Sequence, residues 1–222
     1  MPHFFLMYFL TTFITIFFEA AIIIIIRGRL NGQQLTFKDG LNGAFSKVGK
    51  IFAWSLFSAT IGVILKMISD RSQILGKIVI MILGAAWGVL TFFIAPVLIV
   101  ENFSIKESLK KSAETIKRVW GETVIVNVGV GLYFGLLFLA GFAVFILTLF
   151  SANKAIIIVG AVALFVYILA LIVMSATLSV VFRMVLYEYA NTGNVPQGFS
   201  PEVISMAFRE KKKKNSMGIG ST

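Results

Sequence analysis

The sequence predicts an all-α, polytopic integral membrane protein with five transmembrane helices and amphipathic helices at the cytoplasmic interface. Of its 222 residues, 58% are hydrophobic and 14% are charged, whereas soluble domains are about 45–50% apolar and about 25% charged. Several apolar runs are long enough to cross about 30 Å of hydrocarbon, which takes about 20 residues. These observations exclude a soluble globule and a disordered chain, and we expect residues 1–210 to form a single membrane domain.

Five segments are expected to span the membrane. Four of them plainly have the required length of mostly apolar sequence, and they cover residues 4–26, 78–100, 123–150 and 155–182. The remaining segment, residues 48–68, has a shorter apolar centre, but Lys50 and Lys66 flank that centre and their long side chains can extend its reach. Pro96 lies inside the third span and predicts a static kink, because proline removes a backbone hydrogen bond.

The distribution of Lys and Arg favours five spans over four. With five spans and an external N-terminus, 16 of the 20 Lys and Arg residues are cytoplasmic, whereas without the 48–68 span only 11 are. Because short basic loops are retained in the cytoplasm, we expect a cytoplasmic (inner) membrane protein whose C-terminus is inside. The net charge of +10 then reflects topology and attraction to anionic lipids, and it requires no nucleic acid.

The first span starts close to Met1 and has no basic residues before it, and no signal-peptide cleavage site follows it. Two explanations are open. Either this span inserts with the N-terminus outside, or the chain is a fragment or short form that lacks an upstream span.

Two cytoplasmic loops contain predicted surface helices with similar start signals. Residues 104–107 (Ser-Ile-Lys-Glu) match a capping box and precede a helix over 104–120. Residues 36–39 (Thr-Phe-Lys-Asp) are a looser version before a helix over 36–48. Each helix leads into a hairpin of two spans, which suggests an internal duplication, although amphipathic loops are common in any polytopic protein.

The basic face of the 104–120 helix is expected to contact lipid phosphates on the cytoplasmic side, as is typical of interfacial helices. The candidate contacts are Lys106, Lys110, Lys111, Lys117 and Arg118. A third surface helix is expected over residues 201–210. Residues 211–222 are expected to form a basic, disordered tail.

Glu19 is the most unusual residue, because a carboxylate inside the hydrocarbon is costly and marks a site of interest. Asn127 and Arg183 lie at a similar predicted depth. One hypothesis is a polar cluster of Glu19, Asn127 and Arg183 that lines a cytoplasm-facing cavity. The alternative is that Glu19 only fixes helix packing, since polar pairs between membrane helices often have that role.

The sequence argues against enzymatic chemistry. It has no Cys and one His, and it contains no nucleophile elbow, phosphate-binding loop or zinc-protease motif. We therefore expect no enzymatic activity, no cofactor and no metal site.

Two function classes remain. The first is a non-enzymatic membrane scaffold or partner-binding subunit, whose partner is a membrane protein or a second copy of the chain. Gly84-x-x-x-Gly88 and Gly131-x-x-x-Gly135 are weak motifs that would allow such close helix contact. The alternative is a small transporter or lipid-handling permease that uses the polar cluster around Glu19.

The chain resembles an uncharacterised prokaryotic family of multi-span membrane proteins, known only as a domain of unknown function. The resemblance rests on residues 86–101, 104–112, 120–122 and 187–199, and it extends over residues 8–210. A span that ends in a Pro-Val-Leu run, followed by an acid and a capped basic helix, is also distantly similar to the membrane domain of some glycerophosphodiesterases. The family implies a multi-span fold with a further N-terminal span, and it implies no particular activity.

Overall fold

The computed structural model describes residues 2–71, 74–101, 103–151 and 153–193, and the regular elements in these residues are all α-helices. The helices are α1 (Pro2–Leu30), α2 (Phe37–Ser46), α3 (Val48–Arg71), α4 (Ile74–Leu90), α5 (Ile94–Val100), α6 (Ile105–Arg118), α7 (Trp120–Leu149) and α8 (Lys154–Thr192). The fold is therefore all-α, as the sequence predicts. The predicted surface helix over 201–210 and the tail over 211–222 lie outside the described residues.

Within the described residues, five stretches of helix are long and apolar enough to cross a membrane. They are α1, α3, α7, α8 and the combined stretch Gly76–Val100, which contains most of α4 and all of α5. The short helix α2 lies between α1 and α3 in the chain, and α6 lies between α5 and α7. The long and short helices thus follow one another in the order that the sequence predicts for the apolar stretches and the first two surface helices.

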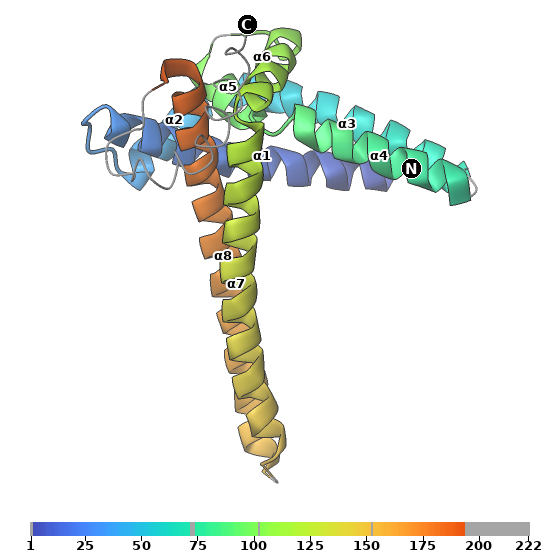
Figure 1. Ribbon diagram of the computed structural model, residues 1–222, viewed down its shortest axis with the longest axis vertical. Coiled ribbons are helices and arrows are strands. Elements are labelled where there is room, and N and C mark those ends of the chain that lie inside the picture. The colour runs from blue at the N-terminus through green and yellow to red at the C-terminus, as the bar shows by residue number, and fades with distance from the viewer. Residues whose placement is uncertain (1, 72–73, 102, 152, 194–222) are drawn as a thin grey trace, which may run out of the picture.

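The long helices form two groups that run crosswise to each other (Figure 1). In one group α3 packs against both α1 and α4, and in the other α7 and α8 form a long hairpin. The helices α2, α5 and α6 and the last turns of α8 lie where the groups meet, and we call this region the junction. The five apolar stretches therefore do not form one parallel bundle.

The buried core lies mainly at the junction. Phe93, Leu98, Met184 and Tyr187 are each at most 1% exposed there, and they come from α5, α8 and the turn before α5. Along the hairpin, by contrast, the most apolar stretches of α7 and α8 contain no buried residue. Since packing is concentrated at the junction, its residues hold the two helix groups together.

Helix α2 packs closely against α1 because a glycine faces the contact. A Cβ atom at Gly40 would lie 2.7 Å from the carbonyl oxygen of Ala21, which is closer than real Cβ atoms come to backbone. Beside this contact, the rings of Phe17 and Phe45 meet edge to face with centroids 4.8 Å apart. The short amphipathic helix is thereby fixed along the C-terminal half of α1.

The third apolar stretch is broken into α4 and α5 by a turn at residues 91–93. The predicted kink at Pro96 is thus a break that starts upstream of the proline. The physical reason is that Pro96 has no N–H for the carbonyl group of Phe92 and its ring crowds that carbonyl. Pro96 itself is tolerated because it lies in the first turn of α5.

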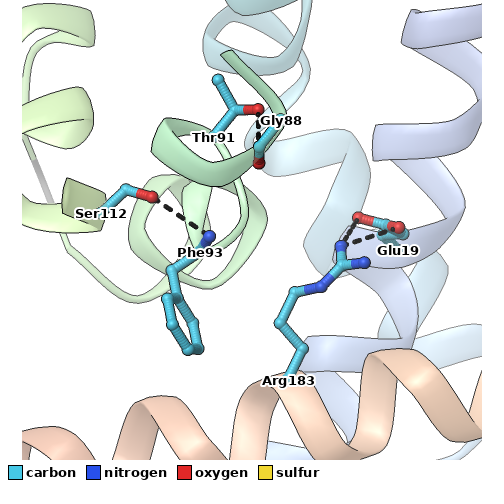
Figure 2. Close-up of polar contacts among 6 residues, drawn as sticks. All are labelled: Glu19, Gly88, Thr91, Phe93, Ser112 and Arg183. Atoms are coloured by element: carbon cyan, nitrogen blue, oxygen red, sulfur yellow. Dashed lines mark hydrogen bonds and ion pairs between the residues drawn. The ribbon is translucent and has the colours of Figure 1, made fainter. Parts of the chain in front are cut away.

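The break exposes a backbone N–H that the structure satisfies from another helix. The N–H of Phe93 donates to the Ser112 hydroxyl on α6 at 3.1 Å (Figure 2). Thr91 Oγ1 donates to the carbonyl of Trp87 at 2.8 Å. Broken helices at membrane depth occur where protein covers them and pairs their polar groups, and the junction provides both.

Both short amphipathic helices begin with a complete capping box. The hydroxyl of Thr36 accepts from the Asp39 N–H at α2, and the hydroxyl of Ser104 accepts from the Glu107 N–H at α6. Each carboxylate in turn accepts from the hydroxyl and from the backbone N–H of its cap residue. These hydrogen bonds, the hydroxyl first, lower the pKa of Asp39 and of Glu107 because they favour the charged form.

We expect the capping boxes to make stability depend on pH in the acid range. A lowered carboxyl pKa in the folded state stabilises the protein above the ordinary value, which is 4.5 for Glu107, and this stabilisation is lost as the pH falls through the lowered value. The midpoint of thermal unfolding in detergent should therefore be higher for the wild type than for Glu107→Gln at pH 7, and the difference should shrink as the pH is lowered below 4.5. A difference that stays constant as the pH is lowered would contradict this.

Candidate functional site at the helix junction

Glu19 and Arg183 form an ion pair that joins α1 to α8. The Arg183 Nη1 atom lies 3.1 Å from Glu19 Oε1 and 3.0 Å from Oε2, so one guanidinium nitrogen donates to both carboxylate oxygens (Figure 2). The side chains are 16% exposed for Glu19 and 22% exposed for Arg183. An unpaired Glu19 carboxylate would be costly in an apolar environment. It is instead paired with the positive charge of Arg183, which lies 164 residues further along the sequence.

The ion pair also contacts the turn between α4 and α5 through an aromatic ring. The guanidinium carbon of Arg183 lies 5.0 Å from the centre of the Phe92 ring, within the range of a cation–π contact. Arg183 Nε is buried without a hydrogen-bond partner. The pair therefore connects three parts of the junction, namely α1, α8 and the turn between α4 and α5.

A second polar contact lies close by on α8. The O–H of Tyr187, which is 1% exposed, donates to Glu101 Oε1 at 2.8 Å. Lys50 Nζ, on the first turn of α3, donates to the backbone carbonyl of Glu101 at 3.2 Å. Glu101 thus links the end of α5 to both α3 and α8.

The structure brings together two of the three residues of the predicted polar cluster. Asn127 uses its side chain within α7, where Nδ2 donates to the carbonyl of Thr123 at 2.7 Å, one turn earlier. Among the described contacts Asn127 does not join Glu19 or Arg183. The reason is geometric, because a polar residue near a helix start can bond back to its own backbone without a partner helix.

The basic residues of α6 lie on its exposed side, while its other side packs into the junction. Lys106, Lys110, Lys117 and Arg118 are exposed and Lys111 is partly buried. The buried side consists of Ser108, Ser112, Thr115 and Ile116. The helix is therefore held by protein on one face and carries its cations on the other, and Arg118 Nη1 also lies 3.5 Å from the carbonyl of Ala190 near the end of α8.

Sequence reasoning missed Ser112, Tyr187 and Glu101 as junction residues. Ser112 and Tyr187 resemble ordinary members of amphipathic or apolar helices, and their partners are 19 and 86 residues away. The acid at 101, directly after the third apolar stretch, was a usable signal, because a carboxylate that is partly buried at the end of an apolar helix needs a donor. In the described residues no group of three or more His, Cys, Asp and Glu side chains is placed to hold a metal ion.

Comparison with known proteins gives a family and no activity. No curated protein matches the chain, and no solved structure does, so the similarity to glycerophosphodiesterase membrane domains has no support from these comparisons. A family model described as a family of unknown function (DUF6159) matches residues 1–198. The match covers most of the chain, and the chain belongs to this family of unknown function.

Proposed function

We propose that the protein is a non-enzymatic scaffold or partner-binding subunit of the cytoplasmic membrane, and that the α7–α8 hairpin is the element that binds the partner. The observation that carries this proposal is the isolation of the hairpin. Over most of its length it packs only on itself, while the other long helices and the short helices gather at the junction (Figure 1).

The hairpin offers a surface suited to close helix contact. A Cβ atom at Gly131 or at Gly135 would meet no other atom within 4 Å, so the glycine face of α7 is open. The glycines at the α7–α8 contact are different ones, since Gly141 faces Tyr167 and Gly160 faces Thr148. Membrane helices associate through small residues that let backbones approach, and this face is free for a second copy of the chain or for another membrane protein.

Filling the glycine face should abolish the association. We expect Gly131→Leu/Gly135→Leu to lower energy transfer between donor-labelled and acceptor-labelled copies in lipid vesicles to the level of a non-interacting membrane protein. If the partner is a different protein, that protein should co-purify with the wild type from membranes in a fixed ratio. It should not co-purify with the Gly131→Leu/Gly135→Leu variant. The physical reason is that two added side chains hold the helix surfaces apart.

A matched control is Ala161→Leu/Ala170→Leu, which adds two similar side chains at exposed positions of α8. This control should associate like the wild type. The proposal fails if the wild type is monomeric and without a partner in vesicles, or if both variants associate normally.

A second candidate is a small transporter or lipid-handling permease. The observation in its favour is the helix break at residues 91–93, which lies beside the Glu19–Arg183 pair through the ring of Phe92. Discontinuous membrane helices commonly form substrate sites in transporters. If Glu19 lies in a transport path, Glu19→Gln should change the cellular phenotype of the gene while the protein level is unchanged; an unaltered phenotype would remove this candidate.

We further propose that the N-terminus of this chain is outside, the C-terminus is inside and all five apolar stretches cross the membrane. This topology requires the two helix groups to lie more nearly parallel in a bilayer than they do in Figure 1. The chain has no Cys, so single cysteines report topology directly. An impermeant maleimide added to intact spheroplasts should label Ser72→Cys, between α3 and α4, and should label Glu114→Cys on α6 only after permeabilisation. Labelling of Ser72→Cys from the inner side alone would contradict the five-span topology.

A further inference from the structure

We propose that the cavity between α1, α2 and α5 binds the phosphate group of an anionic ligand. This cavity, of about 390 Å³, lies at the C-terminal end of α1 and is separate from the hairpin. Its polar lining residues include Arg27 and Lys47, together with Asn31 and Gln33, which have amide side chains. Its lining also contains apolar residues, among them Ile99.

The cavity carries positive charge that no ion pair of the described residues neutralises. The ion pairs found among the described residues are Lys66–Asp70 and Glu19–Arg183, and neither involves the cavity cations. The acids closest in sequence to the cavity are engaged elsewhere. Asp39 is held by its capping box, and the carboxylate of Glu101 accepts from Tyr187.

Backbone hydrogen bonds fix the conformation of the C-terminal end of α1, which lines the cavity. The N–H of Gln33 donates to the carbonyl of Gly28 at 2.8 Å, and the N–H of Gly32 donates to the carbonyl of Arg29 at 3.0 Å. These are the two hydrogen bonds of a Schellman motif, and Gly32 has the positive φ of 79° that this motif needs. Two terminal carbonyls of α1 are therefore already paired, which reduces the negative end charge that would otherwise disfavour an anion.

The position and the mixed lining of the cavity indicate the ligand class. Arg27 directly follows the apolar run that ends at Ile26, so the cavity lies at the level where phospholipid phosphates lie if α1 spans the membrane. Two cations and amide N–H donors suit a phosphate group, for which charge-assisted hydrogen bonds are strong. The apolar lining residues suit the glycerol and first acyl carbons of a lipid, whereas a soluble phosphate compound would use the polar residues alone.

The experiment uses the full chain in neutral detergent and measures binding by calorimetric titration. The probes are dihexanoylphosphatidylglycerol, dihexanoylglycerol as its phosphate-free counterpart, and inorganic phosphate. The wild type should bind the phospholipid and should not bind dihexanoylglycerol. Arg27→Gln/Lys47→Gln should weaken phospholipid binding on the order of tenfold or more, because both charged donors are lost.

Two further variants separate a built cavity from general attraction between charges. Lys77→Gln/Lys154→Gln removes the same charge from exposed positions of α4 and α8 and should bind like the wild type. Ser46→Phe keeps both cations but fills the cavity from an exposed lining position, and it should weaken binding as much as the charge variant. If Arg27→Gln/Lys47→Gln fails to fold, Ser46→Phe still tests whether the ligand occupies the cavity.

The outcomes are distinct. Tight binding of phospholipid but not of inorganic phosphate supports a lipid headgroup as ligand, and equal binding of both supports a soluble phosphate compound. Equal loss in the Lys77→Gln/Lys154→Gln control, binding of dihexanoylglycerol like that of the phospholipid, or unchanged binding by Ser46→Phe would overturn the proposed site.

Discussion

Replacement of Arg183 by methionine is expected to lower the free energy of unfolding by about 3–5 kcal/mol, because removal of one partner leaves the other charge buried and unpaired. Glu19 accepts both of its ion-pair contacts from Arg183 Nη1 and is only 16% exposed. The measurement is reversible unfolding in mixed detergent micelles. We expect the loss to be accompanied by separation of α1 from α8.

A double-mutant cycle tests the cause of this loss. In Glu19→Leu/Arg183→Met no charge remains to be buried, so the double variant should regain most of the stability, since apolar residues can replace a buried ion pair without cost. The control is Lys66→Met, which breaks an exposed pair with Asp70 and should change the free energy of unfolding by less than about 1 kcal/mol. Additive effects of Glu19→Leu and Arg183→Met would show that the pair does not join the helices.

Truncation of Phe93 to alanine is expected to cost about 3–5 kcal/mol, the range for large aromatic residues in a packed core. Phe93 is 0% exposed, its ring centroid lies 4.9 Å from that of Phe92 and 6.4 Å from that of Tyr187, and it is the last residue of the turn that breaks the helix. The cavity left behind would lie where the two helix groups meet. The measurement is again unfolding in mixed micelles, together with limited proteolysis of the turn at residues 91–93.

Phe165→Ala is the matched control for this truncation. Phe165 is 63% exposed on α8, so its removal opens no cavity and should leave the unfolding midpoint nearly unchanged. If the two alanine variants have equal stability, the junction does not hold the fold together in the way that its burial indicates.

Particular residues show how far the sequence leads. The caps at Thr36 and Ser104 follow from local spacing alone, because a capping box needs contacts only three residues apart, and the structure contains both. Pro96 predicts a disturbance of the third span but not its position or size, since the break depends on Ser112 to satisfy the freed N–H of Phe93. Glu19 and Arg183 are recognisable as unusual, but periodicity cannot show that one partners the other.

The cavity between α1, α2 and α5 was not predicted from the sequence, for a related reason. Arg27 and Lys47 look like ordinary loop cations that set topology, and they come from different helix ends. Only the packing of α2 against α1, which Gly40 allows, brings them to one cavity. A site composed of distant residues with common roles has no local signature.

The sequence by itself determined that this is an all-helical protein with five apolar stretches of membrane-spanning length, and where its two amphipathic helices begin. These properties depend on composition, run length and hydrogen bonds between near neighbours, all of which are local. Only the tertiary structure decided that the long helices form two crosswise groups, that Glu19 meets Arg183 without Asn127, and that the core lies at the junction. Those outcomes depend on which surfaces of distant helices fit together, and in long helices that are apolar on all sides, the hydrophobic pattern does not distinguish one such surface from another.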